Sequence, residues 1–280
     1  MVVSIKTNTS ALIALQQLNA TNRDLDAIQD RVSTGLKVRS AKDNAGTFAV
    51  AQKQRADHDA YDAVDQSVQR GINILAISIS ALETISNLII SMKEKAIQAA
   101  NTNLSPADSA IINTSYQSYA SQITTILDAA TYDGVNLINK DPVLPAIHNM
   151  NILAEPTANP SLSIIVPALN IKAATTSVIG NVLTPAAAQT EITSLATMQQ
   201  SISDALATLA GNSLRLETHA GFIEKLQDSL TLGIGSLVDA DLSRESARLK
   251  SVQIQQQLST QALQIANSRP QQILTLFQGV

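Results

Sequence analysis

Residues 72–92 read INILAISISALETISNLIISM, and their apolar spacing decides the class of fold. Two sets of side chains recur there in steps of three and four residues, which is the spacing of coiled-coil helices. The first set is Ile72, Leu75, Ile79, Leu82, Ser86 and Ile89, and the second is Ile74, Ile77, Ala81, Ile85, Leu88 and Met92. Because each set needs its own neighbour, the pattern predicts a helix inside a bundle.

The same periodicity continues toward both ends of the chain. The N-terminal part carries a seven-residue repeat, with Ile28 inside it, made by Leu18, Leu25 and Val32. In the C-terminal part the repeat runs from Leu195 to Ile234, which corresponds to roughly 65 Å of helix. We expect Gly233 and Gly235 to form a joint after this helix, and a last helix to end near Asn267.

The prolines divide the chain into two helical flanks and a broken centre. Six of the eight lie within 142–185, and the flanks hold only Pro106 and Pro270. Ser105 before Pro106 is typical of a helix start, and Tyr132-Asp133-Gly134 is typical of a turn. Within the centre, the short apolar runs 150–153 and 161–166 predict a small β-hairpin.

These patterns predict a mainly α protein, an elongated antiparallel helical bundle or coiled coil with a small β-hairpin region. Five segments are expected, in the order of the chain. They are an N-terminal helical assembly segment (1–40), the N-terminal part of the bundle (41–138), a short exposed segment with the hairpin (139–190), the C-terminal part of the bundle (191–235) and a C-terminal helical assembly segment (236–280).

Composition argues against several classes of function. Cysteine is absent, which excludes thiol catalysis and cysteine-bound zinc, and no basic tract exists to bind nucleic acid. We find no catalytic motif around His58, His148 or His219 and no phosphate-binding loop, so we expect no enzyme, cofactor or metal. No apolar run is long enough to predict a membrane span, and the N-terminus does not read as a cleaved secretory signal.

The two ends of the chain are unusually poor in charge. Residues 1–22 contain one charged side chain, Lys6, and residues 251–280 contain one, Arg269. A solvated helix normally carries many charges, so we expect these ends to pack on each other and on other copies of the chain. The alternative is a core helix buried in a globule. The predicted assembly residues are Leu12, Leu15, Leu18, Leu25, Ile28, Val252, Ile254, Leu258, Leu263, Ile265, Leu274, Leu276 and Phe277.

Two motifs in these flanks resemble bacterial flagellin. Residues 31–45, RVSTGLKVRSAKDNA, resemble the family signature RLSSGxRINSAxDDAA, although Arg39 stands where the family prefers Asn. Asp239-Ala240-Asp241 with Glu245 resembles the run DADxAxE, and the ending from Asn267 through Pro270 to Phe277 resembles AN…PQNVLSLL. The resemblance marks Arg31, Gly35, Ser40, Ala41, Asp43, Asp239, Asp241, Asn267 and Pro270 as motif or joint positions.

The resemblance implies a structural subunit that polymerises into the flagellar filament for swimming. It further implies export through the flagellar secretion apparatus, an export chaperone, contact with filament cap and junction proteins, and an extracellular location. The chain then resembles a minimal flagellin whose ends line the inner tube of the filament. Three other interpretations stay open: a hook–filament junction protein, a secreted helical effector or translocator, and an enzyme hidden in the central segment.

Several motif residues have two interpretations. Gly35 is either a joint between two helical segments or a simple helix C-cap. Arg31 and Asp43 either pair with each other, within or between copies, or are solvated charges. Asp239 and Asp241, with Glu245, lack the spacing of a calcium loop, so we interpret them as an acidic helix start.

Overall fold

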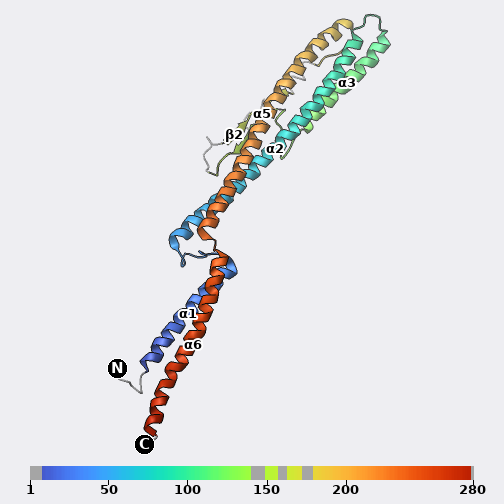
Figure 1. The fold of residues 1–280 in the computed structure, drawn as a ribbon. Coiled ribbons are helices and arrows are strands. Elements are labelled where there is room, and N and C mark those ends of the chain that lie inside the picture. Colours follow the sequence, from blue (N-terminus) through green and yellow to red (C-terminus); the bar gives the residue numbers. More distant parts are fainter. Residues whose placement is uncertain (1–7, 140–148, 157–162, 172–178, 279–280) are drawn as a thin grey trace. The chain divides into compact units, whose positions relative to one another are not determined.

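The computed structural model describes residues 8–139, 149–156, 163–171 and 179–278, with the backbone alone for residues 269–278. The chain divides into two compact units. Unit 1 contains Met1–Ala56 and Ser229–Val280, and unit 2 contains Asp57–Asp228. Long helices and one small antiparallel hairpin make up the regular structure, which confirms the expected mainly α class (Figure 1).

The helices and strands follow each other in an order that sequence periodicity anticipates. They are α1 (Thr9–Thr34), α2 (Ala45–Ala99), α3 (Pro106–Ala129), β1 (Met150–Leu153), β2 (Ser163–Val166), α5 (Pro185–Val238) and α6 (Leu242–Gln278). Ser105 caps α3 as predicted, because its side chain accepts a hydrogen bond from the Asp108 amide at 3.1 Å. The turn at residues 132–135 also forms, with positive φ at Asp133 and Gly134.

The core of unit 2 is built by α2, α3 and α5. One line of fully buried side chains on α2 keeps strict three- and four-residue steps, as coiled-coil packing requires; its members include Leu75, Leu82, Ile85, Ile89 and Met92. The facing line on α5 includes Leu195, Ile202 and Leu209, and α3 adds Tyr116 and Ile123. The two sets predicted on α2 therefore merge into one broad face with half-buried edges, except that Ile77 of the second set is exposed.

Polar contacts inside unit 2 align its helices. Gln199 on α5 donates a hydrogen bond to the Ser86 hydroxyl on α2 at 2.8 Å, so the two polar interruptions of the repeat pair with each other. The buried Gln199 Oε1 has no hydrogen-bond partner among the described residues. The buried Tyr116 hydroxyl donates to the Glu191 carboxylate at 2.7 Å. Burial and this negatively charged neighbour both raise the pKa of Tyr116, so the phenol stays protonated and keeps donating.

Two expected helix ends are wrong. Helix α5 continues through Gly233 and Gly235 to Val238, so the chain breaks at residues 239–241 and not at the glycines. A helical glycine costs only about 1 kcal/mol, and the apolar neighbours Ile234 and Leu237 pack in a cluster that holds the helix together. Helix α6 likewise continues beyond Asn267 and through Pro270 to Gln278.

The longest helix has a membrane-like composition that its packing explains. One 18-residue window of α2 reaches a mean hydropathy of 1.7, long and apolar enough to cross a bilayer by composition alone. The window falls in a helix whose apolar line lies in the core of unit 2. In that window 33% of the residues are buried inside the structure, and a core helix of a bundle passes the same test.

The hairpin docks on the bundle through a glycine. Met150 and Ile152 on β1 alternate with exposed residues, and Ile152 pairs with Ile164 on β2. A Cβ at Gly71 in the middle of α2 would overlap the Ile152 side chain and lie 3.1 Å from Leu216 Cδ1. Gly71 therefore leaves the space into which the hairpin packs.

We predict that Gly71→Ala destabilises the monomer in spite of the better helix propensity of alanine. Propensity contributes about 1 kcal/mol in favour, and overpacking costs about 1–3 kcal/mol. Gly221→Ala is the matched control, because nothing lies within 4 Å of its added Cβ and the gain is unopposed. Urea unfolding should show opposite signs for the two variants, with partial rescue of Gly71→Ala by Ile152→Val. Equal stabilisation of both would contradict this packing.

Candidate functional site

The pair of helices α1 and α6 in unit 1 is the candidate site. They lie side by side and run in opposite directions (Figure 1). Each turns one line of residues with three- and four-residue steps toward the other, and we call these two lines the α1–α6 seam. The seam consists of Ala11, Ala14, Leu18, Thr21, Leu25, Ile28 and Val32 on α1, and of Glu245, Leu249, Val252, Gln256, Ser259, Leu263 and Ala266 on α6.

The seam is thin and partly polar. Leu25, Ile28 and Ala266 are its buried apolar members, and Thr21 and Glu245 are buried polar members. The Thr21 hydroxyl donates to the Gln17 carbonyl in its own helix at 2.9 Å, so it makes no bond across the pair. Small residues at several of the other positions bury little apolar surface, so the seam contributes far less burial than the core of unit 2.

Three polar contacts fix the register of the pair. The Asn8 amide donates to the Ala266 carbonyl at 2.7 Å, and Gln256 donates to the Asn22 side chain at 2.8 Å. Arg31 lies 3.9 Å from Glu245 at the other end of α1. Each step toward the C-terminus of α1 is matched by a step toward the N-terminus of α6, so all three contacts belong to one antiparallel register.

Glu245 is a buried acid at the end of the seam. Its Oε1 lies 3.9 Å from Arg31 and 3.6 Å from Arg248, while its buried Oε2 has no hydrogen-bond partner in the part of the chain that the structure describes. An ion pair with this geometry adds little net stability, because removing the acid from water offsets the attraction. We therefore interpret it as a contact that favours one register over others.

A second apolar line on each helix faces solvent. Leu12 and Leu15 on α1 are 52% and 43% exposed, and Ile254, Leu258 and Ile265 on α6 are 57%, 58% and 65% exposed. Large aliphatic side chains gathered on an otherwise amide-rich surface are typical of a protein interaction site. Of the other predicted assembly residues, Leu18, Val252 and Leu263 are half-buried in the seam, and the side chains of Leu274, Leu276 and Phe277 lie outside the described ones.

The motif residues build the connections of unit 1. Gly35 ends α1 in the left-handed conformation, with φ 70°, and its amide donates to the Arg31 carbonyl, so it is a helix C-cap. Its carbonyl accepts from the Ala240 amide at 2.8 Å, while Lys37 and Val38 donate to the Val238 carbonyl. Gly35 therefore also lies where the two connecting segments pair.

Asp43 closes the turn before α2, and Asp241 caps α6. Asp43 Oδ2 accepts from the Arg39 and Ser40 amides at 3.0 and 2.9 Å, and from the Ser40 hydroxyl. Asp241 accepts from the Arg244 amide at 3.1 Å and so caps α6, which supports the acidic-helix-start interpretation. Arg31 faces Glu245 instead of Asp43, so within the described residues the Arg31–Asp43 pair does not form.

The remaining motif positions have smaller roles. Asp239 forms an isolated antiparallel β-bridge with Leu36, and its amide donates a hydrogen bond to the Gly235 carbonyl. Ala41 lies exposed in the turn after α1, Asn267 is exposed on α6, and the Pro270 side chain is outside the described ones. Sequence reasoning did not select Asn8, Asn22 or Gln256, because an amide beside a seam gives no periodic signal of its own.

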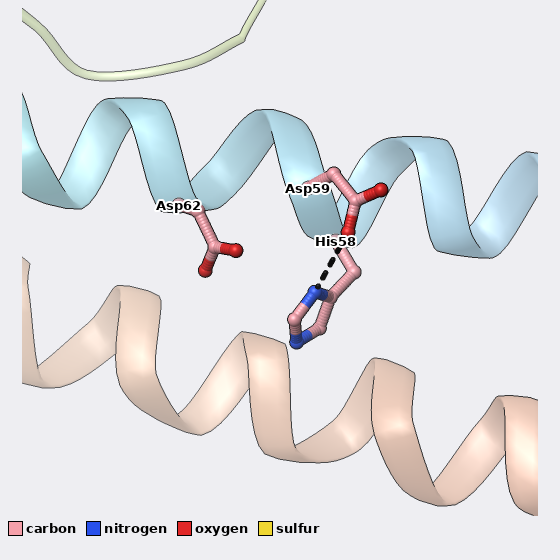
Figure 2. A group of neighbouring side chains, drawn as sticks. All are labelled: His58, Asp59 and Asp62. Carbon is pink, nitrogen blue, oxygen red and sulfur yellow. Dashed lines mark ion pairs between the residues drawn. The ribbon is translucent and has the colours of Figure 1, made fainter.

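One cluster of possible metal ligands lies elsewhere, on α2. His58, Asp59 and Asp62 place one ligand atom each within 4.8 Å of the others (Figure 2). Asp62 already accepts a hydrogen bond from Gln227 at 2.6 Å, and His58 Nδ1 lies 3.5 Å from Asp59 Oδ1. Asp59 is 80% exposed, so the group resembles ordinary helix-surface charges and we assign no metal to it.

Comparisons with known proteins agree on one family. The family model for the bacterial flagellin N-terminal helical region matches residues 5–141, and the C-terminal model matches residues 192–277. Flagellin FljO of Caulobacter vibrioides is 39% identical over 274 residues, 98% of each chain, and a flagellin of Brucella melitensis is 35% identical over 99% of each chain.

Solved structures show the same fold. The crystal structure of Bacillus cereus flagellin is 26% identical, with a TM-score of 0.51 over 56% of this chain and 88% of that one. A putative flagellar hook-associated protein from Vibrio parahaemolyticus, 13% identical, has a TM-score of 0.58 over 70% of this chain and all of its own. The second likeness concerns the fold alone.

We predict that Asp43 titrates below its usual range. Hydrogen bonds from the Arg39 amide, and next from the Ser40 amide, lower its pKa from 3.8. The stabilisation of this turn is therefore fully present above pH 3.8 and is lost as the pH falls through the lower folded value. A carbon-13 NMR titration should give the same low midpoint at the Asp43 carboxyl and at both amides. A midpoint at or above 3.8 would rule out these hydrogen bonds.

We predict a coupling between Asn22 and Gln256. In a double-mutant cycle of Asn22→Ala and Gln256→Ala, urea unfolding should give an interaction energy of about 0.5–1.5 kcal/mol. Asn19→Ala with Gln256→Ala is the control cycle, because Asn19 is exposed on α1 and should show no coupling. Equal coupling in both cycles would mean that this contact does not set the register.

Proposed function

Because the chain belongs to the bacterial flagellin family and is a structural subunit of the bacterial flagellar filament, we propose that it polymerises by burying the exposed aliphatic line of α1 and α6 against other copies. The single observation that supports this mechanism is the exposure of Leu12, Leu15, Ile254, Leu258 and Ile265. Each such side chain gains about 1.5–3 kcal/mol when it is fully buried. In a single chain these side chains stay in water, so this burial free energy is not gained.

The low charge of the ends favours the same mechanism. Outside water, an unpaired charge is costly, whereas amide side chains can hydrogen-bond to a neighbour of the same kind. Residues 251–280 contain Arg269 as their one charged side chain, and residues 1–22 contain Lys6. A surface of this composition tolerates complete burial in a polymer and still stays soluble in a single chain.

We propose a division of labour along the chain. Residues 1–40 and 236–280 serve as the inner assembly segments, 41–138 and 191–235 form the bundle outside them, and 139–190 is the surface segment. The seam supports the first assignment, since α1 and α6 pair within one unit. The work of the subunit is mechanical packing, without catalysis.

The remaining parts of the proposal concern location and partners. The protein is exported through the flagellar secretion apparatus with the help of an export chaperone, and it meets cap and junction proteins at the ends of an extracellular filament. Family membership supports these steps. Recovery of filaments from the medium of secretion-competent cells, and their loss in cells without the apparatus, would test the route.

The alternative of a hook–filament junction protein can be tested by copy number, since the likeness to a hook-associated protein at 13% identity concerns the fold alone. A junction protein is present in few copies and a filament subunit in thousands, so quantitative proteomics of isolated flagella separates the two. An effector would form no filaments from purified protein seeded with filament fragments. A hidden enzyme would need its site within residues 139–190.

We predict that Leu258→Asp leaves the bundle folded and blocks polymerisation, because the charge cannot be buried at an interface. The control is Asn87→Asp, which adds the same charge at an exposed position on α2 in unit 2, outside the α1–α6 pair. Seeded assembly, followed by electron microscopy, should yield filaments for the control alone. Circular dichroism should show equal helicity for both monomers. Normal filaments from Leu258→Asp would refute the proposed interface.

A further inference from the structure

The exposed aliphatic residues of the α1–α6 pair lie on two opposite sides of it. Each residue of an α-helix turns by about 100°, so position relative to the seam follows from spacing. On α1, Leu12 and Leu15 lie on one rotational side of the seam residues Ala11 and Ala14. On α6, Leu258, Ala262 and Ile265 lie on the other rotational side of the seam residues Ser259, Leu263 and Ala266.

The two helices are antiparallel. Residues displaced from the seam in the same rotational sense, each helix viewed along its own chain direction, therefore lie on the same flank of the pair. Leu12 and Leu15 therefore form one flank, which we call flank A. Ile13 turns the opposite way and, in the register given by the Arg31–Glu245 contact, lies level with Leu263. Flank B is defined by Ile13, Leu258, Ala262 and Ile265.

The two flanks differ in chemistry and shape. On flank A, the α6 side offers amides and a hydroxyl instead of aliphatic groups, namely Gln253, Gln257, Thr260 and Gln264. Flank B has aliphatic side chains from both helices. Its members Ile13, Leu258 and Ile265 are all more than half exposed. When flank A is rotated onto flank A, its leucines can meet polar α6 residues. A symmetric contact of B with B would bury aliphatic groups but would leave Leu12 and Leu15 exposed, whereas a contact of A with B buries the aliphatic residues of both flanks.

We propose that flank A of one copy packs on flank B of the next copy. Such a contact joins two different surfaces and leaves a free flank A at one end and a free flank B at the other. It is therefore heterologous, and it continues into an open polymer unless the rotation closes a ring. A contact of A with A would be symmetric and would stop at a dimer. This inference rests on the proposed function and specifies which surfaces of the same site meet.

The absence of cysteine makes the contact directly testable, since introduced thiols meet no background. Three proteins are compared as seeded filaments under mild oxidation: Leu15→Cys, Leu258→Cys and the variant that carries both changes. The double variant should give a ladder of covalent multimers on non-reducing gels. Filaments copolymerised from the two single variants should give dimers and no larger species.

Each single variant alone should stay monomeric on the gel. Its thiols all lie on the same flank, and in an A–B contact that flank faces a flank without a thiol. Dimers from either single variant would overturn the proposal in favour of a symmetric contact. A double variant that closes only bonds within one chain, as judged in dilute monomer, would also overturn it. If a thiol at these sites prevents assembly, Leu12→Cys with Ile265→Cys replaces the pair.

Failure of the inference and failure of the proposed function are distinguishable in the same experiment. Unmodified protein that forms no filaments on seeds argues against the function. Unmodified protein and both cysteine pairs that form filaments without any covalent species argue against the A–B contact alone.

Discussion

The α1–α6 seam limits what a single chain can bury. One line on each helix is available to the partner helix, and small or polar residues occupy much of it, including Ala11, Ala14, Thr21 and Ser259. In unit 2 the corresponding lines are filled with Leu, Ile and Met that are fully buried. Because helices gain most of their stability from packing an apolar face, we expect unit 2 to be more stable than the α1–α6 pair in a single chain. In the proposed mechanism, polymerisation supplies the missing burial.

A thin seam needs another means of choosing its register. Small side chains fit almost equally well after a shift by one heptad, so apolar packing alone specifies the alignment weakly. The contacts of Asn8, Asn22 and Arg31 with α6 are lost together by such a shift. The cost in stability is modest and the gain is a single geometry. A fixed alignment keeps the aliphatic flanks level with each other, which a repeating polymer requires.

Periodicity predicted most of the architecture, because heptad spacing and caps are local signals. The repeats around Leu82 and Leu209, the cap at Ser105 and the hairpin at Met150 all follow from it. Contacts between distant segments were not predictable in this way. From sequence, Gly71 only lowers the helix propensity of α2, whereas the structure shows that it leaves space for the Ile152 side chain. Gly233 and Gly235 misled for the opposite reason, since packing of Ile234 and Leu237 overrides their low propensity. For the site, sequence identified the aliphatic lines but not the amides that align them.

Hydrogen exchange on dilute, unpolymerised protein tests the central claim most directly. Amides in α1 and in α6 should exchange far faster than amides near Leu82 in unit 2, and the same amides should become slow in filaments. Protection of α1 and α6 in the solitary chain that equals the protection of unit 2 would show that the pair is satisfied without neighbours. That result would contradict assembly driven by unburied aliphatic surface.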